Sequence, residues 1–217
     1  LLRASLLRVE DAVSYFYSNM HHIIGDGWSM EVLTKDVLAY YEAFKANEVP
    51  QLKDLRIQYK DYSAWQLSQF EGTFFQSHKE YWLNSLSGEL PILDLPTEKS
   101  RPKIKNHNGQ NLSTYVSKEI TAKLKSFSQN QGGTIFMALL AGWNLLFSKY
   151  CSINDIVIGT VVAGREHADL DNQIGFYINT LALRNQVDTK KNFLELFSKT
   201  KNNMFSAYSH QMYPFDR

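Results

Sequence analysis

The sequence has little of what several classes of protein need. It holds one cysteine, Cys151, among 217 residues, so an internal disulfide is excluded and a reducing, cytoplasmic location is favoured. Lysine and arginine number 23 against 22 acidic residues, so nothing indicates electrostatic capture of nucleic acid or of an anionic membrane. No apolar run approaches the roughly 18 residues of a membrane span. The sequence also contains no repeat and no low-complexity segment.

What is present is typical of a protein with a packed core. Hydrophobic residues make up 44% of the chain and aromatic residues 13%, enough for one large domain or two small ones. The chain opens on "LLRASLLRVE", without an initiator methionine. We therefore expect it to be the middle of a longer protein, and we draw little about location from the missing signal peptide.

Hydrophobic patterning predicts interleaved strands and helices. We expect strands at 1–9, 13–22, 111–117, 155–163 (buried) and 175–184, and helices after Gly27 to Phe44 and at 119–130, 134–150 and 191–208. The aromatic residues between 59 and 82 predict one or two further helices, after a connector at 47–58. Residues 90–110 are expected to form a long ordered loop. The order of these elements indicates an α/β or α+β fold.

The stretch "MHHIIGDGWS" (20–29) is predicted to form a tight turn from a strand into a helix. Alternation along a strand would point His21 and His22 in opposite directions, so the two histidines should not share one role. We expect Gly25 and Gly27 to allow unusual backbone angles in this turn.

These residues fit acyl transfer from a bound thioester. A histidine whose pKa lies near neutral pH can take a proton from an incoming nucleophile. Asp26 could orient an imidazole or pair with a distant cation. The nucleophile would come from the second substrate. The chain has no G-x-S-x-G elbow, and Cys151 lies outside any histidine-rich context, so a covalent route is unsupported.

Two other interpretations of the motif stay open. His21 and His22 can be core histidines whose hydrogen bonds are satisfied, with Asp26 as the N-cap of the next helix. A zinc site would need three or four ligands in space, and the remaining histidines show no ligand spacing, so no metal is expected. These histidines are His78, His107, His167 and His210.

Four motifs in order resemble those of condensation domains from non-ribosomal peptide synthetases. "MHHIIGDGWS" resembles their third core motif, "YKDYSAWQ" (59–66) the fourth, "IGFYINTLALR" (174–184) the fifth and "HQMYPFD" (210–216) the sixth. Residues 132–166 are similar to the long helix and core strand of that family. The resemblance covers nearly the whole chain.

The resemblance implies a chloramphenicol-acetyltransferase-like fold of two lobes in a V, here incomplete at both ends. Residues 1–50 would be the C-terminal part of the N-terminal lobe, and residues 51–217 the connector and most of the C-terminal lobe. The implied reaction is amide formation between a donor acyl or peptidyl thioester and an acceptor aminoacyl thioester. We expect these 217 residues alone to be inactive.

The resemblance also implies roles for single residues. His22 would be catalytic, and His21 would pack and form hydrogen bonds. Asp26 would be architectural, paired with an arginine that lies earlier in the complete domain. Gly27 would border the substrate path.

Other residues in and near the motifs have expected roles as well. Trp28, Tyr177 and Asn179 are candidates for the substrate channel, and Asn179 is equally well explained as a satisfied buried amide. The helical stripe of Tyr59, Tyr62 and Trp65 is expected to pack rather than to touch substrate. Arg184 is expected to form an ion pair between strands.

No cofactor is expected to bind the chain itself, since phosphopantetheine arms would arrive on partner domains. The implied partners are upstream and downstream peptidyl carrier domains and an adenylation domain in the same or a partner chain. Neither nucleic acid nor a membrane is expected as a partner. The alternatives are an epimerisation domain of the same family, a wax-ester-synthase-like acyltransferase, or a non-catalytic module that docks carrier domains.

Overall fold

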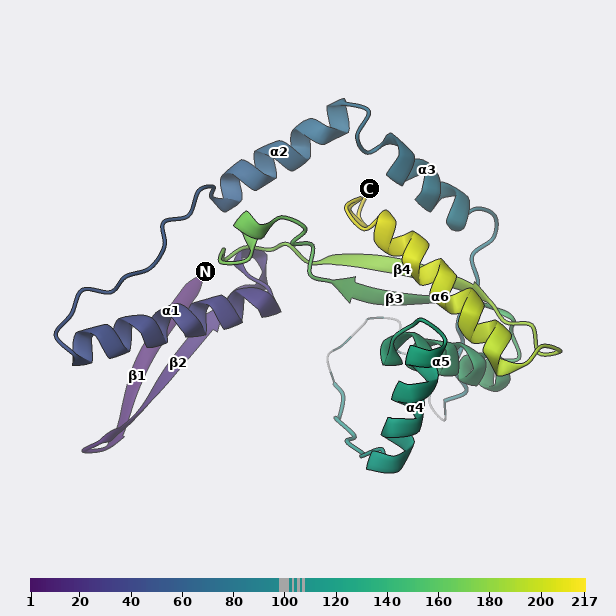
Figure 1. Ribbon diagram of the computed structural model, residues 1–217, viewed down its shortest axis with the longest axis horizontal. Helices are drawn as coiled ribbons and strands as arrows, with labels where there is room; N and C mark the ends of the chain where they lie inside the picture. Colours follow the sequence, from purple (N-terminus) through teal and green to yellow (C-terminus); the bar gives the residue numbers. More distant parts are fainter. Residues whose placement is uncertain (98–101, 103, 105, 107) are drawn as a thin grey trace. The chain divides into compact units, whose positions relative to one another are not determined.

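The structure is a computed structural model that describes residues 1–97, 102, 104, 106 and 108–217. The chain forms two compact units, and each is described by itself. The first unit combines Leu1–Lys79, Val161–Thr180 and Gln211–Arg217, and the second combines Glu80–Thr160 and Leu181–His210. Figure 1 labels the elements. The predicted lobe boundary at residue 50 refers to a complete domain, and it stays a prediction.

The first unit begins with an antiparallel hairpin of β1 (Leu2–Glu10) and β2 (Val13–Met20), as the sequence predicts. The register pairs Leu2 with Met20 and is irregular only between Arg8 and Glu10, next to the turn. A one-turn 3₁₀ helix, η1 (His22–Ile24), follows β2. Strand β2 therefore ends at Met20, two residues before the predicted end.

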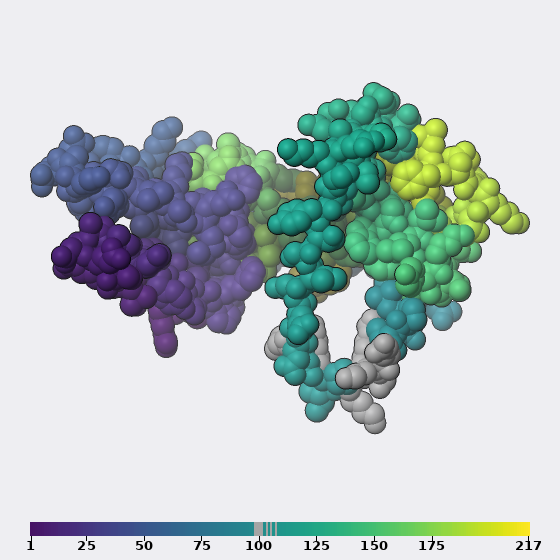
Figure 2. Space-filling view, turned by 90° about the horizontal axis from the view of Figure 1, so that it is seen from below, coloured from purple at the N-terminus to yellow at the C-terminus, as the bar shows by residue number. Residues whose placement is uncertain are grey.

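Both faces of the hairpin are open to solvent. Every residue of β1 is exposed, although the strand reads as strongly apolar. The purple hairpin is open on the face drawn in Figure 2, where it lies beside the indigo helix α1, as it does in Figure 1. An exposed apolar ribbon of this kind favours association with further β structure or with an apolar surface.

Two helices complete the regular part of the first unit. Helix α1 (Gly27–Lys45) and helix α2 (Tyr59–Glu71) confirm the predicted helices on either side of the connector. Asp61 accepts a hydrogen bond from the Gln58 backbone N at 2.8 Å, which closes a cap at the start of α2. An irregular segment at 163–178 contains a second 3₁₀ turn, η2 (Ala168–Leu170), and supplies most of the site described below.

The second unit holds the larger core. Helix α3 (Gln76–Ser85) leads into it, followed by α4 (Lys118–Asn130), α5 (Ile135–Cys151), β3 (Asp155–Val162), β4 (Asn179–Gln186) and α6 (Phe193–Ser209). Strands β3 and β4 pair in a two-stranded sheet. The buried hydrophobic side chains of this unit include Met137, Ala138, Leu140, Ala141, Ile156, Leu181, Leu183, Phe197, Met204 and Ala207.

The predicted inter-strand ion pair of Arg184 is confirmed. Arg184 on β4 donates from Nε to Asp155 Oδ1 at 3.0 Å and from Nη2 to Asp155 Oδ2 at 2.6 Å, a fork that joins β4 to β3. The same guanidinium donates to the carbonyls of Ser87 and Glu89. The hydrogen bonds from Arg184 hold the pKa of the Asp155 carboxyl below its usual value, against the opposing effect of burial.

The predicted strand at 111–117 is wrong. These residues form neither strand nor helix, and Leu112 and Tyr115 are each 97% exposed. Alternation is not enough for a strand, because a strand also needs a hydrogen-bonded neighbour, and no described segment pairs with this one.

Two other strands differ from the prediction in burial or extent. Strand β3 was predicted to be buried, yet only Ile156 is fully buried and Val161 is 63% exposed. Strand β4 begins at Asn179, four residues later than predicted. The predicted ordered loop at 90–110 falls partly outside the described residues, and its described part holds no helix or strand.

No single helix in the described part of the chain is long and apolar enough to cross a membrane. Only α4 and α5 taken together, which meet at a bend of 103°, reach that length and composition.

The start of α5 yields a first testable prediction. Thr134 Oγ1 accepts a hydrogen bond from the Met137 backbone N at 3.3 Å, so Thr134 is the N-cap of this central helix. Thr134→Ala should lower the free energy of unfolding by about 1 kcal/mol, measured by urea denaturation of a complete domain that contains this chain. Thr134→Ser keeps the cap and should stay close to wild type. Equal losses in both variants would contradict a capping role.

Candidate functional site

The turn between β2 and α1 places the two histidines of the motif differently. His21 is the N-cap of η1, and its Nδ1 accepts a hydrogen bond from the Ile23 backbone N at 3.1 Å. The backbone N of His21 donates to the Leu1 carbonyl at 2.8 Å, which ties the turn to the start of the hairpin. His22 is the first residue of η1, and its side chain is exposed. The two histidines therefore have different surroundings, as expected. The reason is not alternation along a strand, because β2 ends at Met20, before either histidine.

The two glycines of the turn do not adopt left-handed angles, contrary to expectation. Gly25 has a φ of −168°, which is extended backbone open to any residue. A Cβ here would lie 2.6 Å from Met20 Sδ, so a larger residue at this position would require the flexible Met20 side chain to move. A Cβ on Gly27 would meet nothing within 4 Å, so that position is open.

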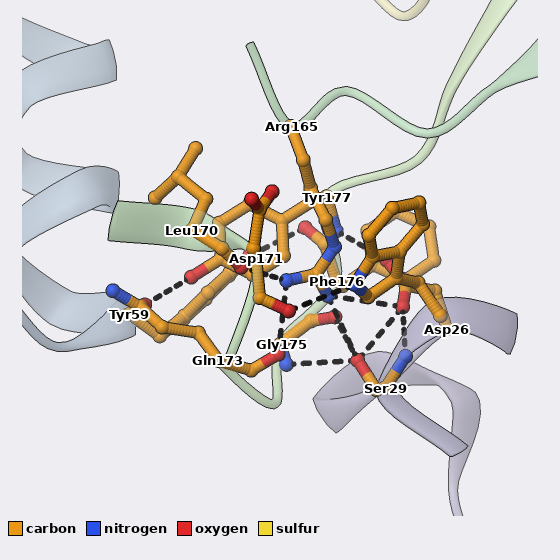
Figure 3. A network of polar contacts seen from close by, with 11 residues as sticks. Asp26, Ser29, Tyr59, Arg165, Leu170, Asp171, Gln173, Gly175, Phe176 and Tyr177 are labelled. Atoms are coloured by element: carbon orange, nitrogen blue, oxygen red, sulfur yellow. Dashed lines mark hydrogen bonds and ion pairs between the residues drawn. The ribbon is translucent and has the colours of Figure 1, made fainter. Parts of the chain in front are cut away.

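Asp26 is the buried centre of the motif, with 2% of its surface exposed. Its Oδ1 accepts hydrogen bonds from the backbone N of Ser29 at 2.8 Å and from Ser29 Oγ at 2.7 Å, which makes Asp26 the N-cap of α1. The same carboxylate pairs with Arg165 Nη2 at 3.2 Å. Asp26 is therefore both the helix cap and the partner of a distant cation (Figure 3).

Arg165 is the cation that neutralises Asp26, so the expectation that this arginine precedes the motif is wrong. Its side chain is 1% exposed. Besides Asp26 it donates to Ser29 Oγ at 3.1 Å, to the Gln173 carbonyl at 2.9 Å and to the carbonyl of Leu170. Its guanidinium carbon lies 4.1 Å from the centre of the Tyr177 ring, a cation–π contact.

Ser29 and Asp26 together hold the backbone of residues 175–177. The Gly175 backbone N donates to Ser29 Oγ at 3.1 Å, and the Gly175 carbonyl lies 2.8 Å from the same hydroxyl. The Tyr177 backbone N donates to Asp26 Oδ2 at 3.0 Å. The start of α1 is thereby bound to a segment about 150 residues further along the chain.

Gly164 lets this segment come close. It has a φ of +64°, and a Cβ there would lie 1.9 Å from the Tyr177 carbonyl oxygen. Both the backbone angle and the lack of space therefore require glycine. The residue directly before Arg165 thus fixes the direction from which the guanidinium enters the site.

Burial and hydrogen bonding act on the ionisable groups in opposite senses. Burial raises the pKa of Asp26, but hydrogen bonds from Ser29 and Tyr177, together with Arg165, outweigh it and leave this pKa below its usual value. Burial raises the pKa of the Tyr177 hydroxyl to about 12, against the opposing charge of Arg165. Asp26 is therefore ionised and Tyr177 neutral at any pH near 7.

A cavity of about 980 Å³ opens beside this network, within the first unit. Aromatic side chains form much of its lining, among them Tyr59, Tyr62, Trp65, Phe176, Tyr177 and Phe215. Tyr62 and Tyr177 pack with ring centres 4.8 Å apart, so the expected packing role of the stripe on α2 is confirmed, but the stripe lines the cavity too.

The three candidates for the substrate channel lie in different places. Tyr177 and Asn179 line the cavity, whereas Trp28 does not, and its Nε1 donates to the Asp171 carbonyl at 2.8 Å. Asn179 Nδ2 donates to the carbonyls of Gln211 and Tyr213, both at 2.7 Å. Its Oδ1 accepts from the backbone N of Thr180 and of Phe215. The amide is saturated by the protein, which favours the structural interpretation of Asn179.

Arg165, Ser29 and Gly175 belong to the site but were not singled out from the sequence. A signal existed for Arg165, because a lone cation directly after the apolar run "DIVIGTVVAG" is well placed to be buried. No group of three histidine, cysteine, aspartate or glutamate side chains in the described residues could hold a metal ion. His107, one of the histidines of the sequence without ligand spacing, lies outside the described residues.

Comparison with known proteins adds to this geometry. The family model of the condensation domain matches residues 1–217. Gramicidin S synthase 2 of Brevibacillus brevis is 39% identical over 216 residues, which are 100% of this chain but 5% of that protein. Bacitracin synthase 2 of Bacillus licheniformis is 38% identical over 216 residues, which cover 100% of this chain and 8% of that protein. The chain thus spans a small part of the curated relatives that it matches.

Solved structures agree on the fold. The X-domain from teicoplanin biosynthesis superposes with a TM-score of 0.90 at 24% identity, over 99% of this chain and 49% of that one. The first condensation domain of the CDA synthetase gives a TM-score of 0.76 at 19% identity, over 100% of this chain and 48% of that one. The predicted chloramphenicol-acetyltransferase-like fold is confirmed, for a chain that covers about half the length of these structures.

The buried ion pair yields a stability prediction. Asp26→Ala leaves the Arg165 charge buried without a counter-ion, so we expect a loss of about 3–5 kcal/mol in the free energy of unfolding. Asp36→Ala, which removes a half-buried carboxylate on the same helix, should change it by about 0.5 kcal/mol at most. Urea denaturation of the complete domain measures both. A denaturation curve of Asp26→Ala like that of wild type would contradict the structural role.

The lowered pKa of Asp26 predicts a dependence on pH. The unfolded chain binds the Asp26 proton near pH 3.9, and the folded protein binds it only at lower pH. The stability that this carboxylate contributes is therefore complete above about pH 5 and is lost as the pH falls through the folded pKa. Asp26→Asn cannot titrate, so its deficit relative to wild type should be smaller at pH 3.5 than at pH 6. A deficit independent of pH would contradict the assignment.

Proposed function

The chain belongs to the condensation domain family, and we propose that within a complete domain it forms amide bonds on carrier-bound thioesters. The donor is an acyl or peptidyl thioester and the acceptor an aminoacyl thioester, each on the phosphopantetheine arm of a carrier domain. The family and fold support this class of reaction. The identity of the two amino acids is left open by the proposal.

One observation carries the choice of His22 as the catalytic residue. The motif has three ionisable side chains, His21, His22 and Asp26. Within the described residues, only the side chain of His22 makes no hydrogen bond or ion pair. His21 uses Nδ1 to cap η1, and Asp26 is consumed by its cap and by Arg165. His22 is also exposed, so its nitrogens can reach a substrate.

The chemistry that we propose needs no nucleophile from the protein. The acceptor amine, whose pKa is about 7.7–8.0 when unperturbed, is partly neutral near pH 7 and attacks the donor carbonyl carbon. A C–N bond forms, the C–S bond breaks, and the donor arm leaves as a thiol. His22 takes the amine proton as the tetrahedral intermediate forms, and it can return that proton to the departing sulfur.

Positioning is the other contribution that the site can make. Holding an amine in line with a carbonyl can supply several kcal/mol of barrier lowering. The cavity beside the network is large enough for part of an acyl group, and its aromatic lining suits apolar substrate atoms. We place the substrate-channel roles of Tyr177 and Asn179 there, Asn179 through the wall that its hydrogen bonds hold.

The second candidate is a non-catalytic docking module. The X-domain of teicoplanin biosynthesis, a solved structure with the same fold, is known in complex with OxyB. If this chain served only to dock a partner, His22 would be dispensable. The two candidates therefore differ in the effect of a single substitution.

His22→Ala in the complete domain should abolish amide formation between two loaded carrier domains and leave the melting temperature close to wild type, because the side chain is exposed. Mass spectrometry of the carrier-bound products measures the yield. Glu31→Ala, an exposed substitution on α1, is the control and should leave the yield unchanged. A normal yield from His22→Ala would favour the docking module. Inversion of the donor on a single carrier, without an amide, would indicate an epimerisation domain.

A further inference from the structure

The segment that Asp26 and Ser29 hold carries one side chain to His22. The residues on both sides of Phe176 are anchored, since Gly175 N donates to Ser29 Oγ and Tyr177 N donates to Asp26 Oδ2. Phe176 is therefore the central residue of a backbone segment that the start of α1 fixes at two points.

Helix α2 fixes the same residue from another direction. The Tyr59 hydroxyl donates to the Phe176 carbonyl at 3.0 Å. The Tyr59 ring also packs edge-on against Tyr177, with ring centres 5.2 Å apart. With its neighbours and its own carbonyl all bound, the Phe176 backbone has little freedom to move (Figure 3).

From this anchored backbone, the ring of Phe176 meets the imidazole of His22. The ring centres are 5.4 Å apart and the planes are inclined by 67°, an edge-to-face arrangement that aromatic pairs favour. Among the described residues, this is the ring contact that His22 makes, and no hydrogen bond orients its nitrogens.

We propose that Phe176 is the positioning residue for His22: its ring orients the imidazole while leaving both nitrogens free for substrates. This inference rests on the proposed catalytic role of His22. Many catalytic histidines are oriented by a carboxylate that occupies Nδ1. Here the motif carboxylate, Asp26, pairs with Arg165 and does not contact the imidazole. It influences His22 indirectly, by holding the backbone of 175–177 and with it the ring of Phe176.

The contact has a kinetic consequence. Without the ring, the imidazole of an exposed histidine is free to rotate about its side-chain bonds and to leave the line between amine and carbonyl. A misplacement of about 1 Å can cost on the order of 100-fold in rate. Because Phe176 also lines the cavity, a loss of substrate binding would raise the half-saturating concentration, whereas a loss of imidazole orientation lowers the rate at saturation.

Three variants of the complete domain test this. Phe176→Leu removes the aromatic ring but keeps an apolar side chain. Phe176→Tyr keeps the ring and should rescue the function. Phe205→Leu on α6 is the matched control, because Phe205 is 49% exposed and Phe176 is 40% exposed. All three should fold, with melting temperatures within about 2 °C of wild type, as expected for partly exposed positions. Phe176→Met replaces Phe176→Leu if the latter melts lower.

The first measurement is the rate of amide formation in a single turnover with two loaded carrier domains. We expect Phe176→Leu to lower the rate at saturating carrier by about 10- to 100-fold, with the half-saturating concentration within about two-fold of wild type. Phe176→Tyr and Phe205→Leu should both stay near the wild-type rate.

The second measurement reports on His22 without any substrate. In a domain labelled at its histidines, the NMR signal of the His22 ring is assigned by its loss in His22→Gln. The nearby aromatic ring should displace this signal, so Phe176→Leu should shift and broaden it, whereas Phe176→Tyr and Phe205→Leu should not.

The proposal stands only if Phe176→Leu changes both the rate and the His22 signal and Phe176→Tyr preserves both. A slower reaction with an unchanged His22 signal would overturn it and indicate direct contact of Phe176 with substrate. A shifted signal with a normal rate would overturn it as well. If His22 is not the catalytic residue, His22→Gln will retain activity. The His22 NMR signal in the Phe176 variants still shows, in that case, whether Phe176 orients the imidazole.

Discussion

The ion pair between Asp26 and Arg165 is the interaction on which the site depends. Both side chains are almost completely buried, and removing two charges from water costs several kcal/mol per ion. The guanidinium offsets that cost through three further acceptors and the Tyr177 ring, although its Nε has no partner in the described residues. A pair of apolar residues could be equally stable here. It could not, however, bind the backbone N–H groups of Ser29 and Tyr177 at the same time.

The pair explains why one short motif contains residues of such different character. Asp26 joins the start of α1 to the segment 175–177, and Ser29 adds a second attachment to Gly175. His21 closes the turn that precedes them. All of this hydrogen bonding leaves His22 exposed beside a fixed turn, a position that suits the role we propose for it. The buried charges therefore serve geometry, and the exposed imidazole stays available for the proton transfer that we propose.

Much of this fold could be predicted from the sequence, because helices α1, α4, α5 and α6 and both strands of the hairpin follow local periodicity. The site could be predicted only in part. Asp26 and His22 stand in one motif, but Arg165 is 139 residues away, and no local pattern states which cation will meet a buried carboxylate. The strand expected at 111–117 failed for the same reason, since a strand depends on a partner that local alternation cannot supply.

The late start of β4 shows how strand formation and the site compete for the same backbone. The sequence "GFYINTLALR" is apolar enough to pair from Gly175 onward, yet the ladder begins at Asn179. A longer ladder would use some of the N–H groups of Gly175 and Tyr177 and the carbonyl of Phe176. They form hydrogen bonds with Ser29, Tyr59 and Asp26 instead. The chain therefore gives up four residues of regular strand, and the backbone groups released in this way carry the attachment that brings Phe176 to His22.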